Sequence, residues 1–428
     1  MYKTCVIGAG AAGLIAAIEA SSDRSDVIMI DKNKKAGMKL YATGNGRCNL
    51  ANMHMAFSCY YGNAFSTEIL GEKPADTVIS YMKELGIDCY DKNGYVYPRS
   101  SQASAVVWAL LDRLRENNVK LKVGTEVGEI KPAYGTEADE AVTGGARAAG
   151  NESEKSFYVI YDKDGSEICR AENVILATGG YSAPKLGAAS EKVSSSIYDS
   201  LGIKYSAAKP ALCPMICKPV TDSAADMTEL SGIRSNARVT VTMMDGKTES
   251  EEGEVQFTDY GLSGIVVFDL SYFDDIKSVN VNTLYEVDKD SFISTYEKVM
   301  TACPGRSVQG FLNGYINDKL AAFIVNKVVG IDVKTKLGDT EAGFAEKLYD
   351  AVSNLEFSFE KLYGYEHSQV TKGGILCDEM DASTMMLKDR RGLYAVGEAV
   401  DVCGKCGGYN LMWAFISGMI AGRDAKAR

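Results

Sequence analysis

A glycine motif near the start of the chain sets the first structural expectation. Residues 8–13, GAGAAG, match the pattern G-x-G-x-x-G, and they lie between a short apolar run, residues 3–7, and an alanine-rich segment. In this pattern the first glycine permits a tight turn, the second lets the backbone approach a pyrophosphate, and the third lets a helix pack closely on the strand. Backbone N–H groups and the helix dipole then face the phosphates. The motif predicts a β-α-β unit that binds a dinucleotide.

The segment after the glycine motif supports this expectation. Residues 25–30 form a second apolar run that ends at Asp31. This acid follows the glycines by about 20 residues, where a carboxylate can accept hydrogen bonds from ribose hydroxyls. Strand, glycines, helix, strand and acid in this order make an ordinary glycine-rich turn the weaker explanation. The β-α-β unit alone does not separate NAD from FAD.

Composition narrows the class of protein. A chain of 428 residues is long enough for about two or three domains, and its net charge of −11 argues against general nucleic-acid binding and against docking on anionic lipid. No apolar run reaches the length of a membrane span, and Met1 leads directly into the glycine motif, so neither a membrane span nor a signal peptide is expected. The 11 cysteines are an odd number scattered along the chain, which indicates reduced thiols and a cytoplasmic location. The oligomeric state is left open.

The first 188 residues continue the α/β pattern. Residues 101–117 have apolar side chains at helical spacing, and they lead into a third parallel strand at 119–123. Residues 132–155 are rich in Gly, Ala and Glu and nearly free of large apolar groups, so a mobile surface loop is expected there. Short apolar runs predict antiparallel strands at 126–130, 157–161 and 167–170 and a buried strand at 173–177.

The composition changes after about residue 188. Alternating runs at 237–243 and 254–257 predict an antiparallel barrel or sandwich. Three later segments have helical spacing: residues 291–301, 308–329 and 341–353.

The α/β pattern then returns at the end of the chain, with a strand at 392–396 and a closing helix at 410–426. One nucleotide-binding domain built from both chain ends, with an insert between them, is the economical arrangement. The expected domains are residues 1–188 with 372–428 for cofactor binding, 189–285 with 354–371 for a β-barrel-like insert, and 286–353 for a helical insert.

Residues 402–413, VCGKCGGYNLMW, contain Cys403-x-x-Cys406, which is compatible with a redox dithiol, half of a zinc site or two packed thiols. Zinc needs further ligands, and the chain has only two histidines and no second C-x-x-C, so no metal site is expected. A flavin-linked dithiol usually receives electrons through a second glycine fingerprint, and the sequence contains none. Two small thiols in a packed loop are the favoured interpretation.

The same stretch suits a long cofactor. A predicted strand runs into Gly397-Glu398, and Gly407 and Gly408 precede the terminal helix. The Glu398 carboxylate can bond ribityl hydroxyls. The N–H groups at 408–411, with their helix dipole, can face flavin N1 and the C2 carbonyl, where reduced flavin carries negative charge. FAD is long enough to reach from the N-terminal motif to this second site, so FAD is the expected cofactor.

Four stretches together resemble one flavoprotein family. LYATGNGRCNLAN, residues 40–52, is similar to the S-G-G-G-R-C-N-x-T-N signature of the BaiN-type NAD(P)/FAD-dependent oxidoreductases, also called aminoacetone oxidase-like flavoproteins. Residues 253–271, 371–385 and 392–418 are similar to the family's G-E-x-x-F-T-H-x-G-x-S-G-P, T-x-G-G-V and C-terminal flavin segments. The resemblance covers essentially the whole chain. It implies FAD and an α/β fold, in which a glutathione-reductase-like Rossmann flavin domain carries an inserted antiparallel β-barrel and a small helical domain.

The motifs and the resemblance together predict a cofactor site drawn from both ends of the chain. The resemblance implies that residues 43–49 line the flavin, that 178–180 lie by the pyrophosphate and ribityl path, and that 407–411 cap the pyrimidine edge. The predicted cofactor-binding residues are Gly8, Gly10, Ala11, Ala12, Gly13, Asp31, Lys32, Lys39, Thr43, Gly44, Asn45, Gly46, Arg47, Cys48, Asn49, Val127, Ala177, Thr178, Gly179, Gly180, Gly397, Glu398, Gly407, Gly408, Tyr409, Asn410 and Leu411.

Some positions depart from the family pattern. Asp259 stands where the family often has His, and Ile265 stands where it often has Pro. LGAASEKV, residues 186–193, replaces a more glycine-rich segment. These three differences limit what the resemblance implies about the substrate and about contacts near the insert. Asp31, in place of the commoner Glu, should leave ribose binding intact.

Two further features are expected to be structural. Cys48, inside the signature, is interpreted as a packing thiol. Gly418 and Gly422 have the spacing of a membrane dimer motif, but the segment is too short and ends in charges. Close packing of the helix on the sheet is therefore expected.

Hydride transfer at flavin N5 is the expected chemistry, because the cofactor carries the difficult step. Arg47 could polarise a carbonyl and Tyr409 could donate a proton, but a surface ion pair and a packing aromatic explain them equally well. The expected function is NAD(P)H-dependent reduction of an activated C=C bond in a small-molecule substrate. The alternatives are an oxidase that uses O₂ on an amine or alcohol, a tRNA-modifying flavoprotein, which the acidic charge disfavours, and a non-catalytic flavin-binding redox sensor.

Overall fold

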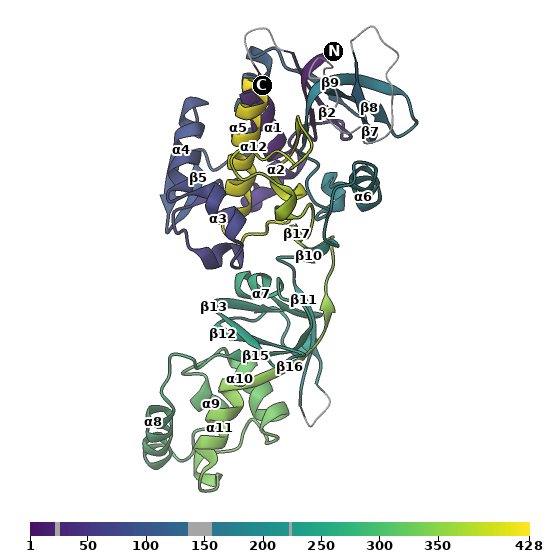
Figure 1. Ribbon diagram of the computed structural model, residues 1–428. Helices are drawn as coiled ribbons and strands as arrows, with labels where there is room; N and C mark the ends of the chain where they lie inside the picture. Colours follow the sequence, from purple (N-terminus) through teal and green to yellow (C-terminus); the bar gives the residue numbers. More distant parts are fainter. Residues whose placement is uncertain (22–25, 136–155, 222–224) are drawn as a thin grey trace. The chain divides into compact units, whose positions relative to one another are not determined.

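The structure is a computed structural model, and it describes residues 1–21, 26–135, 156–221 and 225–428. The chain divides into two compact units, Met1–Pro210 with Val370–Arg428, and Ala211–Gln369 (Figure 1). Both ends of the chain therefore belong to one unit, and a continuous internal segment makes the other. The division falls at Pro210 and Val370, compared with expected domain limits of 188 and 372.

A largely parallel sheet organises the first unit. It is formed by β1 (Tyr2–Ile7), β2 (Val27–Asp31), β6 (Lys120–Val123), β7 (Val127–Tyr134), β8 (Ser156–Asp162), β9 (Glu167–Leu176) and β18 (Leu393–Ala395). The strand order is β6-β2-β1-β9-β8-β7, and β18 also pairs with β9. The pairs β1–β2, β1–β9, β2–β6 and β9–β18 are parallel. The predicted Rossmann-like arrangement is confirmed, because a C-terminal strand joins the N-terminal sheet.

Strand β9 corrects one expectation. The sequence predicts two strands, at 167–170 and 173–177, but a single strand runs through Glu167–Leu176. Strand β1 pairs with it from Ala171 onwards, which keeps the backbone between the two predicted runs extended. The first half of β9 pairs antiparallel with β8, and its last residues pair parallel with β18. One strand therefore connects the N-terminal, middle and C-terminal parts of the sheet.

Strand β7 is longer than the predicted strand at 126–130. Its pairing with β8 continues to Tyr134, so the first residues of the expected surface loop at 132–155 are strand. Residues 136–155 of that expected loop lie outside the described residues.

Helices α1 (Ala11–Ala20), α5 (Ala103–Glu116) and α12 (Tyr409–Ala427) lie side by side in the first unit (Figure 1). A Cβ built at Gly418 would lie 2.5 Å from the carbonyl oxygen of Ala12, and one built at Gly422 would lie 2.5 Å from that of Ala16. The expected helix–sheet packing of these glycines is wrong. They let α12 approach α1, because only glycine leaves room for the backbone of the neighbouring helix.

Smaller elements complete the first unit. They are α2 (Met38–Ala42), β3 (Ala51–Asn52), α3 (Ala64–Leu70), α4 (Pro74–Glu84), β4 (Cys89–Lys92), β5 (Tyr95–Pro98), α6 (Glu191–Ser200), β10 (Lys209–Ala211) and β17 (Val370–Lys372). The core that holds them is one cluster of buried apolar side chains, which includes Val6, Ile28, Val107 and Phe415.

The second unit contains a closed antiparallel barrel. Its strands are β11 (Met215–Pro219), β12 (Arg234–Met243), β13 (Thr248–Phe257), β14 (Gly261–Ser263), β15 (Ile276–Asn282) and β16 (Leu355–Leu362). They pair in the order β11-β14-β13-β12-β15-β16, and β16 pairs back with β11. Closure removes the free sheet edges that an open sheet exposes. Of the two architectures expected from the alternating runs, the barrel is confirmed.

The helices of the second unit are α7 (Ile265–Leu270), α8 (Lys289–Ala302), α9 (Val308–Leu312), α10 (Asp318–Phe323) and α11 (Phe344–Ser353). The single helix expected at 308–329 is wrong. The chain leaves α9 at Asn313-Gly314, and α10 begins after Asn317, whose side chain accepts a hydrogen bond from the N–H of Lys319 at 3.0 Å. Turn and cap residues therefore override the apolar spacing.

Candidate cofactor site

The glycine motif forms the turn between β1 and α1. Gly8 has a φ of +107°, and a Cβ there would lie 2.2 Å from the carbonyl oxygen of Ala177. A Cβ at Gly13 would lie 1.9 Å from the carbonyl oxygen of Gly8. At Gly10, by contrast, no described neighbour lies within 4 Å of a built Cβ. Packing requires glycine at the first and third positions, and the second faces open space, as the three roles of the motif demand.

Asp31, at the end of β2, holds this turn in place. Its Oδ2 accepts a hydrogen bond from the N–H of Ala9 at 2.6 Å, and its Oδ1 accepts one from the N–H of Asn33 at 2.7 Å. Each carboxylate oxygen has a second lone pair, so the acid can bind the turn and a ribose hydroxyl together. The ribose contact stays a prediction, whereas the bond to the glycine turn is a role that sequence spacing did not reveal.

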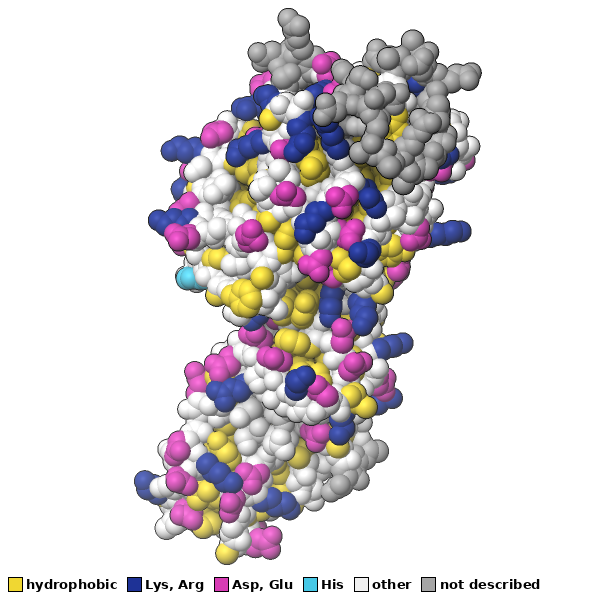
Figure 2. All heavy atoms as spheres, in the orientation of Figure 1, with side chains coloured by type: hydrophobic (Ala, Val, Ile, Leu, Met, Phe, Trp, Pro, Cys, Tyr) yellow, Lys and Arg dark blue, Asp and Glu magenta, His cyan; other side chains and the backbone are white. Residues whose placement is uncertain are grey.

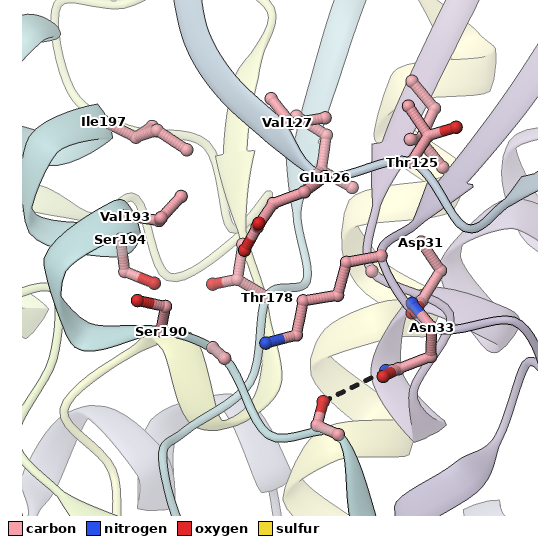
Figure 3. A pocket seen from close by; sticks show the side chains of 16 residues that line it. Asp31, Asn33, Thr125, Glu126, Val127, Thr178, Ser190, Val193, Ser194 and Ile197 are labelled. Carbon is pink, nitrogen blue, oxygen red and sulfur yellow. Dashed lines mark hydrogen bonds between the residues drawn. The ribbon is translucent and has the colours of Figure 1, made fainter. Parts of the chain in front are cut away.

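A cavity of about 70 Å³ lies at the ends of β1 and β2 (Figure 3). The predicted cofactor-binding residues that line it are Gly8, Asp31, Lys32, Val127 and Thr178. The lining residues that the sequence missed are Ile7, Ile30, Asn33, Thr125, Glu126, Gly187, Ala189, Ser190, Val193, Ser194 and Ile197. Many of the missed residues belong to the segment 187–197 at the start of α6. The departure of residues 186–193 from the family pattern is the signal that marks this segment.

Glu398 joins three separate segments of the first unit. Its Oε2 forms an ion pair with Nζ of Lys39 at 2.8 Å, and its Oε1 accepts a hydrogen bond from the N–H of Thr371 at 2.7 Å. A Cβ built at Gly180 would lie 2.6 Å from Oε1. The structure therefore brings together Lys39, Gly180 and Glu398, all predicted cofactor-binding residues. It adds Thr371, which belongs to the T-x-G-G segment and which the predicted site omits.

Residues 43–49 form an irregular turn with left-handed backbone. The φ angle is +57° at Gly44, +54° at Asn45 and +60° at Cys48. Burial raises the pKa of the Cys48 thiol to about 12, so this thiol stays protonated and packs against its neighbours, as expected. The Oδ1 atom of Asn49 is buried, and it has no hydrogen-bond partner within the described ranges.

The glycines that precede α12 contact β3, the strand that follows this turn. Gly407 and Gly408 have φ angles of +118° and +102°, and a Cβ at Gly408 would lie 2.6 Å from the carbonyl oxygen of Ala51. The Nδ2 group of Asn52 donates a hydrogen bond to the carbonyl oxygen of Gly407 at 2.9 Å. Two segments that are far apart in the sequence are therefore held against each other at the predicted ring end of the site.

Asn410 fixes the loop that precedes α12. Its Oδ1 accepts a hydrogen bond from the N–H of Gly404 at 2.8 Å, and its Nδ2 donates one to the carbonyl oxygen of Gly404 at 2.7 Å. This loop contains both cysteines of the Cys403-x-x-Cys406 motif. Both polar groups of the Asn410 side chain are thus used by the protein itself.

The side chains of Arg47 and Tyr409 make other contacts than those considered for catalysis. The Tyr409 hydroxyl donates a hydrogen bond to the carbonyl oxygen of His54 at 2.7 Å, and the residue is 7% exposed. Arg47 is exposed, and its guanidinium carbon lies 5.2 Å from the centroid of the Tyr97 ring. The Tyr409 contact supports a packing role, and Arg47 stacks on an aromatic ring instead of forming the surface ion pair considered from the sequence.

The other predicted residues lie on the same unit. They are Ala11 and Ala12 in the first turn of α1, Thr43 after α2, Ala177 and Gly179 after β9, Gly397 after β18, and Leu411 in the first turn of α12.

The space around several glycines indicates whether the predicted cofactor-binding residues could hold FAD. Within the described ranges, nothing lies within 4 Å of a Cβ built at Gly10, Gly46 or Gly179. These glycines belong to the turn after β1, to the 43–49 segment and to the segment after β9. Together with the cavity at Asp31, they leave backbone open to a long ligand. Gly10 and α1 would hold the pyrophosphate, the cavity would hold the adenosine half, and residues 43–49 with 407–411 would hold the ring.

The described residues contain neither a metal-binding cluster nor a membrane-spanning helix. No group of three or more His, Cys, Asp or Glu side chains among them could hold a metal ion. None of the helices they form is long and apolar enough to cross a membrane.

Comparison with known proteins places the chain among flavoproteins. Residues 2–424 match the family described as HI0933-like protein Rossmann domain. A 3-dehydro-bile acid delta(4,6)-reductase of Clostridium scindens is 31% identical, over 100% of this chain and 100% of its own. Ribosomal RNA dihydrouridine synthases of Escherichia coli and Haemophilus influenzae are 26% and 27% identical, over 100% and 97% of this chain and 98% and 96% of theirs.

A solved structure of 3-ketosteroid-delta4-(5alpha)-dehydrogenase from Rhodococcus jostii RHA1, in complex with 4-androstene-3,17-dione, is 15% identical with a TM-score of 0.48, over 100% of this chain and 97% of its own. The family match includes the glycine turn, the inserted barrel and the C-terminal strand and helix in one continuous span. The chain therefore belongs to the HI0933-like Rossmann family and is a BaiN-type, FAD-dependent oxidoreductase.

Proposed function

We propose that this chain is a reductase that saturates an activated C=C bond in a small organic molecule, with NAD(P)H as the electron donor. The observation that carries the proposal is the 31% identity, over the full length of both chains, to a 3-dehydro-bile acid delta(4,6)-reductase. The name of that relative describes the reduction of C=C bonds. The ribosomal RNA dihydrouridine synthases are likewise named for a product with a saturated bond. Saturation of a C=C bond is thus common to these relatives.

A C=C bond conjugated to a carbonyl group is the substrate class that suits a flavoprotein of this kind, because its β-carbon is electron-poor and accepts a hydride. The chemistry that bound FAD supplies is two-electron hydride transfer. The protein must orient the substrate, exclude water and allow a proton to reach the α-carbon. The Tyr409 hydroxyl already donates a hydrogen bond to the carbonyl oxygen of His54. The proton for the α-carbon therefore comes from another group or from water.

The start of α12 supports such chemistry electrostatically. The helix is 19 residues long, it begins after Gly408, and its first turn contains no acidic residue. Its dipole favours negative charge at this end. The nearby carboxylate of Glu398 is neutralised by Lys39 at 2.8 Å. Residues at this end would therefore favour negative charge on a bound flavin ring, without an opposing free carboxylate at Glu398.

A ribosomal RNA substrate is the second candidate, because two relatives named as ribosomal RNA dihydrouridine synthases match at 26% and 27% identity. RNA binding requires a basic surface. This chain has a net charge of −11, and acidic and basic side chains are intermixed over most of the described part of the face in Figure 2. The charge favours a small molecule over RNA and over an anionic membrane. The odd number of cysteines, 11 scattered along the chain, supports a cytoplasmic location.

Anaerobic stopped-flow spectroscopy tests the proposal as two half-reactions. The FAD-loaded protein is mixed with NADH or NADPH, and loss of the visible flavin band reports reduction. The reduced protein is then mixed with a 3-oxo-4-ene steroid, with cyclohexenone, with ribosomal RNA or with O₂, and return of the band reports reoxidation. We expect reduction by a nicotinamide and fastest reoxidation by a conjugated ketone.

Other outcomes select the alternatives. Fastest reoxidation by ribosomal RNA would establish the second candidate. Reduction by an amine or alcohol, followed by fastest reoxidation by O₂, would identify an oxidase. Failure of both half-reactions would indicate a non-catalytic flavin-binding redox sensor.

A further inference from the structure

The cavity at the end of β2 has a wall that the family motifs do not describe. One side is formed by the ends of β1 and β2 and by the start of β7. The opposite side is the segment 187–197, which leads into α6 and contains the residues that depart from the family pattern. Figure 3 shows Ser190, Ser194 and Val193 across the cavity from Asp31 and Asn33.

Hydrogen bonds fasten this wall to the end of β2. The Nδ2 group of Asn33 donates to the carbonyl oxygen of Gly187 at 3.0 Å, and the ammonium group of Lys32 donates to the carbonyl oxygen of Ala188. A Cβ at Gly187, which has a φ of +78°, would lie 2.1 Å from Oδ1 of Asn33. The N–H of Ala189 also donates to the carbonyl oxygen of Gly180 at 3.1 Å. The wall is therefore held at a fixed position relative to the strand that ends in Asp31.

The lining of the cavity has the chemistry of a site for a flat heterocyclic base. Its apolar side chains can contact the faces of a ring, and its hydroxyl groups can donate hydrogen bonds to ring nitrogens. The apolar residues are Ile7, Ile30, Val127, Val193 and Ile197, and the hydroxyl residues are Thr125, Thr178, Ser190 and Ser194.

Two carboxylates line the same cavity, and they differ in their partners. Both oxygens of Asp31 accept hydrogen bonds from backbone N–H groups. Glu126, which directly precedes β7, is half-buried, and no described residue donates a hydrogen bond to its carboxylate or forms an ion pair with it. Figure 3 shows its carboxylate extending into the cavity towards Thr178 and the start of α6. A half-buried carboxylate gains free energy from a donor supplied by a ligand.

We propose that Glu126 recognises the adenine base of FAD by accepting a hydrogen bond from its exocyclic amino group. A carboxylate only accepts hydrogen bonds, and the amino group is the only hydrogen-bond donor on the adenine base of a nucleotide. The acid thus selects an adenine dinucleotide over one whose base lacks this donor. Asn33 and the wall that it fastens keep the base within reach of Glu126.

Affinity measurements on two cofactors test this selection without any turnover. Protein stripped of flavin, and shown to regain the visible band with FAD, is titrated with FAD and with an analogue that carries hydrogen in place of the adenine amino group. Flavin fluorescence gives each Kd. A hydrogen bond to a charged acceptor implies that wild-type protein prefers FAD by roughly ten- to a hundredfold.

The variants Glu126→Ala and Glu126→Gln and a matched control give the decisive comparison. In Glu126→Ala we expect the preference to fall to about onefold, because the acceptor is gone. Glu126→Gln should keep part of the preference, because its amide oxygen still accepts a hydrogen bond. Glu129→Gln, three residues further along the chain in β7, removes a carboxylate paired with Lys131 at 2.9 Å and should leave the preference unchanged.

Two results would overturn the proposal. One is an unchanged preference for FAD over the analogue in Glu126→Ala. The other is a loss in Glu126→Ala that affects both cofactors equally but disappears with a 2′-deoxyadenosine analogue, because that result assigns Glu126 to the ribose instead of the base. Circular dichroism of each variant establishes that the comparison is made on folded protein.

Discussion

The two ends of the predicted cofactor site are built in opposite ways. At the adenosine end, side chains such as Glu126 and Ser190 face a cavity of about 70 Å³. At the ring end, the side chains of Tyr409 and Asn410 are bonded to backbone groups of the protein at 2.7–2.8 Å. Side chains are available to a ligand at the first end. At the second they hold loops, so we expect a ring bound there to meet backbone groups near Gly408.

This difference determines what a substitution should do. A side chain removed at the adenosine end should change affinity for FAD more than stability. A side chain removed at the ring end should change stability first, because its hydrogen bonds lie within the protein. The glycine motif contains both cases in one turn, since Gly13 is packed and Gly10 is open.

The largest effect is expected for Gly13→Ala. Its Cβ would lie 1.9 Å from the carbonyl oxygen of Gly8, and backbone at that distance must move. We expect the free energy of unfolding of the flavin-free protein to fall by about 3 kcal/mol, as measured by urea denaturation. Gly10→Ala is the matched control. It should change stability by no more than about 0.5 kcal/mol and still weaken FAD binding more than about tenfold, because its methyl group enters the space reserved for the pyrophosphate. Equal stability losses in the two variants would contradict the assignment of Gly13 to packing and of Gly10 to the ligand.

Asn410→Ala should have the next largest effect. Two hydrogen bonds to Gly404 are lost, and both partners are backbone groups. We expect a loss of about 2 kcal/mol in the free energy of unfolding, again measured on the flavin-free protein. The exposed Asn313, in the second unit, provides the control, and Asn313→Ala should change stability by less than about 0.5 kcal/mol. If Asn410→Ala weakened FAD binding with full stability retained, the side chain would be a ligand contact and the proposed contrast would fail.

The same contrast explains how much could be predicted from the sequence. The strand–glycine–helix–strand pattern depends on local rules, and the structure reproduces it down to the separate roles of Gly8, Gly10 and Gly13. The joining of both chain ends in one sheet also followed, because a lone strand and helix after residue 392 need a partner.

Other features depended on contacts between distant segments. No spacing rule indicates that Thr371 bonds to Glu398, or that the segment 187–197 forms a wall of the cavity. The break after α9 was missed for a different reason, because apolar spacing was given more weight than the Asn-Gly pair. The predicted packing of Gly418 against the sheet was wrong. A glycine in a helix indicates that another part of the chain comes close, but it does not indicate which element, and here that element is α1.

Glu398→Gln tests the part of the site between the two ends. The amide keeps an oxygen for the N–H of Thr371 but loses its ion pair with Lys39, whose side chain is 31% exposed. We expect a stability loss of about 1.5 kcal/mol, because a half-buried ammonium group is left unpaired. Adding Lys39→Met to Glu398→Gln should restore part of the lost stability, because the unpaired ammonium group is then removed. Urea denaturation of the wild type, the two single variants and the double variant measures the coupling between the two residues. Additive losses would show that the 2.8 Å pair contributes no coupling.

The smallest effect is expected for Tyr409→Phe, and it bears most directly on chemistry. The hydroxyl donates to the carbonyl oxygen of His54 at 2.7 Å, so its removal leaves one acceptor unpaired and should cost about 1 kcal/mol of stability. The rates of flavin reduction and reoxidation should stay within about twofold of wild type, because a phenol committed to a backbone carbonyl is not free to protonate a substrate. Stopped-flow absorbance measures both rates on the same sample. A fall of more than about tenfold in reoxidation by a conjugated ketone, with the reduction rate unchanged, would make Tyr409 a proton donor, and the ring end would then present side chains to its ligand as the adenosine end does.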